Sequence, residues 1–189
     1  MILPRIPDWY HVLFGCAKMG AVAMPGTNLL TTNDIEYRIN RAGGKVAVVS
    51  AAHVYSVEAI KDKCPTLEHL ILVRMNRKDW HSFETLCAQS DDCFDRTMVG
   101  PTQSTDLILI YFTSGSTEMP KMVGRDHAYA LSHLITKSYW QDLSEDDIHW
   151  TLTDTGWAKG AWGLFYPQLL AGCAIVLYDG ECFDLEIHF

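Results

Sequence analysis

The residues best suited to chemistry form one run of glycine and small hydroxyl-bearing side chains that ends in a lysine. It reads Thr113-Ser114-Gly115-Ser116-Thr117-Glu118-Met119-Pro120-Lys121. Glycine lets the backbone approach a ligand closely, and consecutive amide N–H groups in such a loop form a concavity that binds anions. The hydroxyl groups add donors, and a lysine ammonium suits phosphate oxygens. The run therefore predicts a phosphate-binding loop.

The segments on either side place this loop at the end of a strand. Residues 106–112 (Asp-Leu-Ile-Leu-Ile-Tyr-Phe) are nearly all apolar, as expected of a strand covered on both faces. A helix is predicted from about His127 to Trp140, with a loop between strand and helix. Ligands of open α/β sheets gather at the carboxyl ends of strands, which is where this run lies. It does not match the Walker A pattern.

Helical and strand patterns alternate along the chain. Helices are predicted over residues 8–19, 32–42, 53–63, 82–88, 127–140 and 160–170, and strands over 21–24, 45–50, 69–73, 106–112, 148–152 and 174–177. This alternation predicts an α/β fold, with a largely parallel sheet and flanking helices.

Composition narrows the function classes. Of the 189 residues, 48% are apolar, which is enough to bury a core. The net charge of -8 and the scattered Lys and Arg residues argue against a nucleic-acid partner. The apolar runs are short and interrupted, so no membrane span is predicted. No cationic segment followed by an apolar one opens the chain, so no signal peptide is expected.

Cysteine and histidine residues give weaker signals. None of the six cysteines forms a Cys-x-x-Cys pair, which favours free thiols in a reducing compartment. A metal site would need His81, Cys87 and Cys93 to converge, but their spacing fits no zinc pattern, so no metal site is predicted. Three histidines are candidate general bases, but without a Ser-His-Asp order they are expected in the core or on helix surfaces: His127, His133 and His149.

The run from Thr113 to Lys121 closely resembles the signature loop of the adenylate-forming (AMP-binding) superfamily, Thr-Ser-Gly-[Ser/Thr]-Thr-Gly-x-Pro-Lys. Further stretches are similar to medium-chain acyl-CoA synthetases: Leu3 to Trp9, Gly20 to Thr27, and the Asp-Thr-Gly-Trp run ending at Trp157. The likeness covers nearly the whole chain. It implies that residues 1–189 are part of the large N-terminal domain of such an enzyme.

The resemblance also implies a reaction and its participants. A carboxylic acid, expected to be of medium chain length, attacks the α-phosphate of Mg-ATP, and CoA then displaces AMP from the acyl-AMP. Residues Thr113 to Lys121 would hold the β- and γ-phosphates of ATP. Trp157 would lie near the acyl pocket or the approach of CoA, with an ordinary core aromatic as the alternative. The resemblance implies the mitochondrial matrix in a eukaryote, although no transit peptide is seen, and otherwise the cytoplasm.

The sequence departs from the family pattern in several places. Glu118 stands where the family has glycine, and its carboxylate beside a triphosphate is expected to weaken ATP binding. His127 lies six residues after Lys121 rather than four, which indicates a small insertion at residues 124–126. The family segments that hold adenine, ribose and Mg²⁺, and the adenylation lysine, do not occur here, so the catalytic residue is unknown. A truncated, non-catalytic nucleotide-binding protein is the alternative function.

Overall fold

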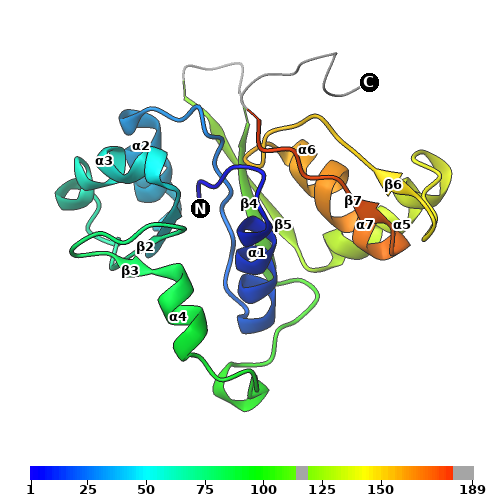
Figure 1. Cartoon of the computed structure of the whole chain (residues 1–189), viewed down its shortest axis with the longest axis horizontal. Helices are drawn as coiled ribbons and strands as arrows, with labels where there is room; N and C mark the ends of the chain where they lie inside the picture. The colour runs from blue at the N-terminus through cyan, green and yellow to red at the C-terminus, as the bar shows by residue number, and fades with distance from the viewer. Residues whose placement is uncertain (114–118, 181–189) are drawn as a thin grey trace.

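The computed structural model describes residues 1–113 and 119–180, and has an α/β fold in which three small sheets are packed by helices (Figure 1). The strands are β1 (Val46–Val49), β2 (His69–Leu72), β3 (His81–Ser82), β4 (Leu107–Thr113), β5 (Lys121–Asp126), β6 (Ile148–His149) and β7 (Ala174–Ile175). The α-helices are α1 (Pro7–Met19), α2 (Thr32–Ala42), α3 (Val54–Glu58), α4 (Phe83–Gln89), α5 (Ala128–Tyr139), α6 (Ala158–Gly160) and α7 (Tyr166–Ala171).

Parallel pairing dominates the described sheets. In the first sheet β1 pairs with β2 and β2 with β3, all parallel, and β6 pairs with β7 in the same sense. The strand predicted over residues 21–24 is reduced to one parallel bridge between Ala23 and Leu109. The expected alternation of helix and parallel strand is therefore confirmed, although the strands are shorter than predicted.

The loop predicted over residues 113–126 is wrong in its second half. Residues 121–126 form β5, which pairs antiparallel with β4. Its sequence, Lys-Met-Val-Gly-Arg-Asp, has little of the apolar or β-branched character that predicts a strand. Residues 121–126 are extended because their backbone is hydrogen-bonded to β4, not because of their own side chains. The proposed insertion at residues 124–126 therefore lies inside a strand.

Helix α2 has clear start and stop signals. The Thr31 hydroxyl accepts a hydrogen bond from the Asp34 amide at 3.3 Å, and the Asp34 carboxylate accepts one from the Thr31 amide at 3.0 Å. This capping box satisfies amide groups at the start of the helix. Gly43 ends the helix with a φ of 66°, which suits glycine. Ile35 and Ile39 are buried on one face, so α2 is anchored against the first sheet.

Two hydrophobic clusters hold the fold together. One joins α1 to β4 and to the helical segment after Ala161, through Trp9, Leu13, Leu109 and Phe165 among others. The other packs α2 and α3 on β1 and β2. Figure 1 shows α1 in front of β4 and β5 at the centre, with α2 and α3 on one side and α5 to α7 on the other.

Two of the predicted helices are interrupted. Residues 53–63 form α3, with 3₁₀ turns at Ala51–His53 and Lys61–Lys63. Residues 158–171 form α6 and α7, joined by a π-helical turn at Ala161–Phe165. Within the described ranges, no helix is long and apolar enough to cross a membrane.

Candidate functional site

The two ends of the predicted phosphate-binding loop lie side by side. β4 and β5 form an antiparallel ladder whose last pair joins Thr113 to Lys121. A strand ladder fixes the separation of the residues that it pairs, so both ends of the run are held on one scaffold. Thr113, Met119, Pro120 and Lys121 belong to the described chain, and residues 114–118, including Glu118, lie outside it.

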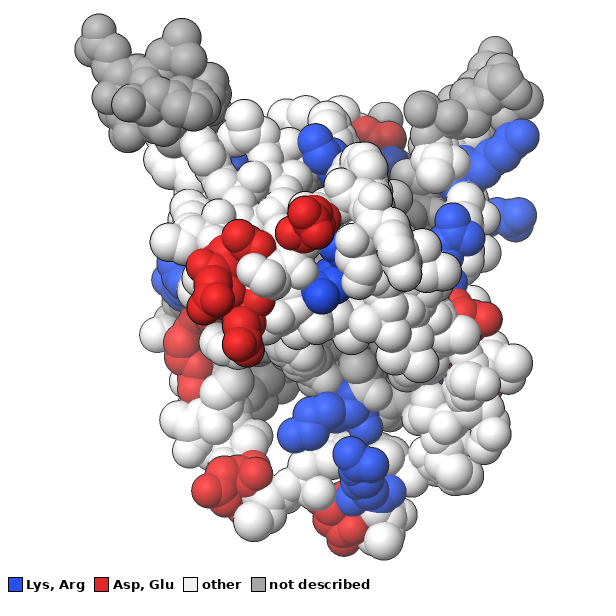
Figure 2. Space-filling view, turned by 90° about the vertical axis from the view of Figure 1, so that its right-hand side faces the viewer, with Lys and Arg blue, Asp and Glu red and all other residues white. Residues whose placement is uncertain are grey.

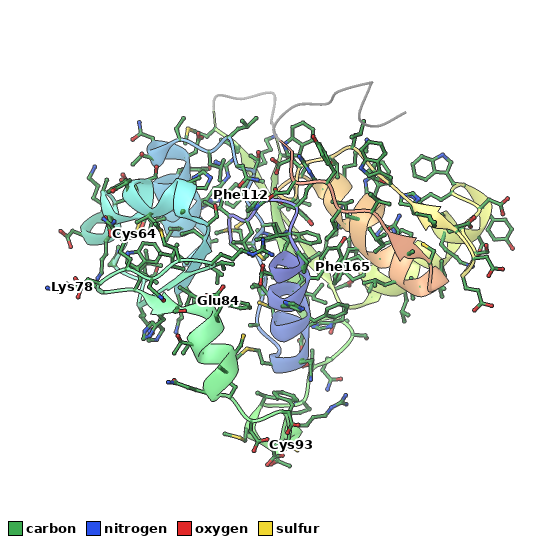
Figure 3. All side chains as sticks on the ribbon, in the orientation of Figure 1. Cys64, Lys78, Glu84, Cys93, Phe112 and Phe165 are labelled. Atoms are coloured by element: carbon green, nitrogen blue, oxygen red, sulfur yellow. The ribbon has the colours of Figure 1, made fainter. Side chains whose placement is uncertain are left out.

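A cavity of about 510 Å³ opens beside these loop ends. It is lined by four segments that are distant in sequence: the turn after Ala23, helix α2, the end of the β4–β5 hairpin, and the start of α6. The lining residues are Pro25, Gly26, Thr27, Arg38, Phe112, Thr113, Pro120, Gly156, Trp157 and Ala158. Figure 3 labels Phe112 at the end of β4, where these segments meet.

Close backbone contact joins two of these walls. A Cβ built on Gly156 would lie only 1.8 Å from the Thr27 nitrogen, so the position has no room for any larger residue. Asp154 reinforces this contact, because its carboxylate accepts hydrogen bonds from the Gly156 amide at 2.7 Å and the Asn28 amide at 3.3 Å. The glycine of the Asp-Thr-Gly-Trp run is thus needed to bring the two turns together.

The N-terminal segment is hydrogen-bonded to the chain around Gly156, on the same side of the cavity. The Arg5 guanidinium donates to the carbonyl oxygens of Thr153 at 3.2 Å, Tyr178 at 2.6 Å and Gly180 at 2.9 Å. The Thr155 hydroxyl donates to the Leu3 carbonyl at 2.5 Å and is itself buried. These long-range bonds tie two motifs that the sequence singled out separately.

Trp157 lies on the cavity wall and is 53% exposed. This position differs from that of Trp9, which is 1% exposed in the main core. A half-exposed indole beside a cavity offers an apolar face to a ligand. The alternative of an ordinary core aromatic does not fit this geometry.

Helix α2 contributes two residues that the sequence analysis did not identify. The Tyr37 hydroxyl donates to the Pro120 carbonyl at 3.1 Å, and its ring packs edge-to-face on Phe112 with centroids 6.0 Å apart. The Arg38 guanidinium lies over the Phe112 ring at 5.2 Å from the centroid. In the sequence they are two polar positions of an amphipathic helix, so only the tertiary fold reveals their proximity to the loop.

His133 is a core residue, as predicted. It is 6% exposed and packs between Tyr129 and Tyr166, and burial lowers the pKa of its imidazole. Neither ring nitrogen has a hydrogen-bond partner within the described chain. The ring therefore has the features of a packing residue rather than a general base.

Cys16, Cys64, Cys87, Cys93 and Cys173 are all free thiols. Around Cys93, the side chains close enough to share an ion are those of Asp91 and Asp92, all of them exposed, and not those of His81 and Cys87. Exposed acidic groups commonly gather in this way without a metal.

The family model described as "AMP-binding enzyme" matches residues 1–188. The chain belongs to the AMP-binding enzyme family. The mitochondrial acyl-coenzyme A synthetase ACSM5 of Mus musculus is 38% identical over 178 residues, covering 93% of this chain and 30% of that protein. The mitochondrial ACSM4 of Rattus norvegicus is 36% identical over 188 residues, covering 98% of this chain and 32% of the relative. The chain thus spans about a third of the length of these relatives.

Solved structures of AMP-binding ligases have the same fold. The anthranilate CoA ligase AuaEII, solved in complex with anthranoyl-AMP, has a TM-score of 0.84 at 22% identity, covering 95% of this chain and 35% of that one. The acyl-CoA synthetase of Brucella canis also has a TM-score of 0.84 at 22% identity. These matches confirm the expected fold class, part of the large N-terminal domain of an adenylate-forming enzyme.

Proposed function

We propose that this chain is the phosphate-binding part of an AMP-forming acid–CoA ligase that acts on a medium-chain carboxylic acid. In the first step a carboxylate oxygen attacks the α-phosphorus of ATP, giving acyl-AMP and releasing pyrophosphate. In the second step the thiol of CoA attacks the acyl carbon and AMP leaves. The observation that carries the proposal is the loop of residues 113–121, held at both ends by the β4–β5 ladder beside a cavity.

The loop would act through electrostatic stabilisation and positioning. Its amide and hydroxyl groups would donate to the β- and γ-phosphates, and the Lys121 ammonium would offset the charge that develops on pyrophosphate. No acidic side chain occurs among the described residues that line the cavity. Mg²⁺ would therefore enter this part of the site on the phosphate oxygens of ATP, as is common for Mg²⁺ with nucleotides.

Trp157 would form the apolar contact with the organic substrate. Its indole is half-exposed and lines the same cavity as Thr113 and Pro120 at the loop ends, so one ligand could contact both. We also propose a mitochondrial location, in the matrix; the relatives named mitochondrial support the organelle.

Calorimetric titration of the full chain with Mg-ATP tests the proposal. We expect saturable binding in the parent chain and a loss of about tenfold or more in Lys121→Ala, because an interaction between a charged donor and phosphate is removed. Lys78→Ala is the matched control: Lys78 is exposed, and Figure 3 labels it far from Phe112. Its affinity should equal that of the parent.

Acyl-AMP formation then separates the two function classes. Exchange of labelled pyrophosphate into ATP that depends on a medium-chain acid would support the ligase. Nucleotide binding without exchange would favour the non-catalytic alternative. A folded chain with no affinity for ATP would refute both.

A further inference from the structure

Arg38 is the charged residue of the cavity wall. Among the described residues that line the cavity it is the one with an ionised side chain, and the others are apolar, aromatic, glycine or threonine. Its side chain is only 14% exposed. A cation in partly buried surroundings interacts more strongly with an anion than one in open water does.

The position of Arg38 is fixed by packing. Its guanidinium lies over the Phe112 ring, one residue before the start of the phosphate-binding run. The preceding residue of α2, Tyr37, is hydrogen-bonded to Pro120 at the other end of the run. Consecutive residues of one capped helix therefore contact both ends of the loop, which holds the guanidinium in register with it.

The hydrogen bonds made by Arg38 leave donors available. Within the described chain, both use Nη1, which donates to the Asp34 carbonyl at 3.2 Å and to Asp34 Oδ1 at 3.4 Å. A guanidinium has five N–H donors, so Nη2 and Nε keep theirs for a ligand. The planar fork of these donors matches the geometry of phosphate oxygens.

The ion pair with Asp34 adds too little stability to explain why an arginine stands at position 38. The Thr31 hydroxyl is the main cause of the lowered pKa of Asp34, and Arg38 contributes less. The pair joins residues i and i+4 of one helix across 3.4 Å with Asp34 39% exposed, and such pairs add only a few tenths of a kcal/mol.

We propose that Arg38 is a second cationic ligand, alongside Lys121, for an oligophosphate anion in this cavity. The inference rests on the proposed function for the identity of its ligand, since both the triphosphate of ATP and the diphosphate of CoA have this chemistry. Lys121 is exposed at the start of β5, next to Pro120 of the cavity wall, whereas Arg38 belongs to α2. The anion would thus be bound by side chains from two elements.

Titration of the full chain with inorganic tripolyphosphate, Mg-ATP and CoA tests this role. We expect Arg38→Gln to weaken tripolyphosphate binding by about tenfold or more and to reduce its dependence on salt. Arg41→Gln is the matched control, because Arg41 lies exposed on the same helix and is not part of the cavity wall. A loss for Mg-ATP alone would assign the site to the nucleotide, and a loss for CoA alone would assign it to the thiol substrate.

A second measurement needs no variant at this position. Arginines of the parent chain can be modified with phenylglyoxal and followed by mass spectrometry. Tripolyphosphate should slow the modification of Arg38 and leave that of Arg41 unchanged. Unchanged rates at Arg38, or equal affinities of the parent and a folded Arg38→Gln chain, would overturn the proposal.

The outcome for Arg38 is distinct from that for the ligase. Protection of Arg38 by tripolyphosphate in a chain that forms no acyl-AMP would leave the anion site standing and remove the proposed catalysis. Acyl-AMP formation at the same rate in Arg38→Gln and the parent would support the proposed catalysis and remove the anion site at Arg38.

Discussion

At the residue scale, the charges around the cavity come from different parts of the sequence. Lys121 was identified from its motif, whereas Arg38 is identified only from its contact with Phe112. Glu118, where the family has glycine, lies outside the described residues, and its expected weakening of ATP binding stays a prediction. The two proposed cationic ligands therefore come from β5 and from α2, which are far apart in the sequence.

His133 should make the stability of the chain depend on pH. Burial lowers the pKa of His133 below its ordinary value of 6.5, so the unfolded chain binds a proton before the folded one does. Stability should then fall as the pH drops below about 6.5. Replacing His133 with phenylalanine removes this titration, and it sacrifices no hydrogen bond found within the described chain.

We expect the difference in melting temperature between pH 7.5 and pH 5.5 to be smaller in His133→Phe than in the parent. Thermal unfolding followed by circular dichroism measures both values. Leu131→Phe serves as a control, since Leu131 is exposed on the same helix and its replacement removes no titratable group. An identical pH dependence in His133→Phe and the parent would contradict the assignment.

At the element scale, the cavity depends on how closely two turns approach. The turn that contains Thr27 and the turn before α6 touch through their backbones at Gly156. Asp154 joins them, because its carboxylate accepts hydrogen bonds from the Asn28 and Gly156 amides. The Thr155 hydroxyl ties the second turn to the Leu3 carbonyl.

Gly156→Ala should destabilise the chain by about 1–3 kcal/mol, because overpacking against rigid backbone forces the two turns apart. Equilibrium unfolding in urea measures the change. Gly15→Ala is the control: a Cβ at this position in α1 meets no atom within 4 Å, and alanine favours the helix. Equal unfolding free energies of Gly156→Ala and the parent would show that the contact is not needed.

At the scale of the whole molecule, a broad apolar surface is left uncovered. On α5 and just after it, four large side chains are 64% to 88% exposed: Leu131, Ile135, Tyr139 and Trp140. Ile148 of β6, in the same lobe, is 76% exposed. Figure 2 views the molecule from the side of this lobe, and much of that face carries no charge. Contiguous apolar surface of this kind promotes association.

We therefore expect the isolated chain to self-associate at micromolar concentration or to need a partner for folding. Sedimentation velocity over a range of concentrations measures the association. Leu131→Lys combined with Ile135→Glu should shift the chain toward monomer, whereas Tyr55→Lys, at an exposed site on α3, should not. A monomeric parent with one cooperative thermal transition would count against this expectation.

The α/β alternation and the family were predictable from the sequence and are confirmed, whereas the phosphate-binding chemistry of the loop stays a prediction. These follow from local signals: small residues with a lysine after an apolar strand, and start and stop residues such as Thr31 and Gly43. The strand character of residues 121–126 was not predictable, because β5 exists only through its pairing with β4. Only the tertiary structure placed Arg38, Tyr37 and Gly156 beside the loop ends, since contacts between residues distant in sequence arise from packing, which local patterns do not encode.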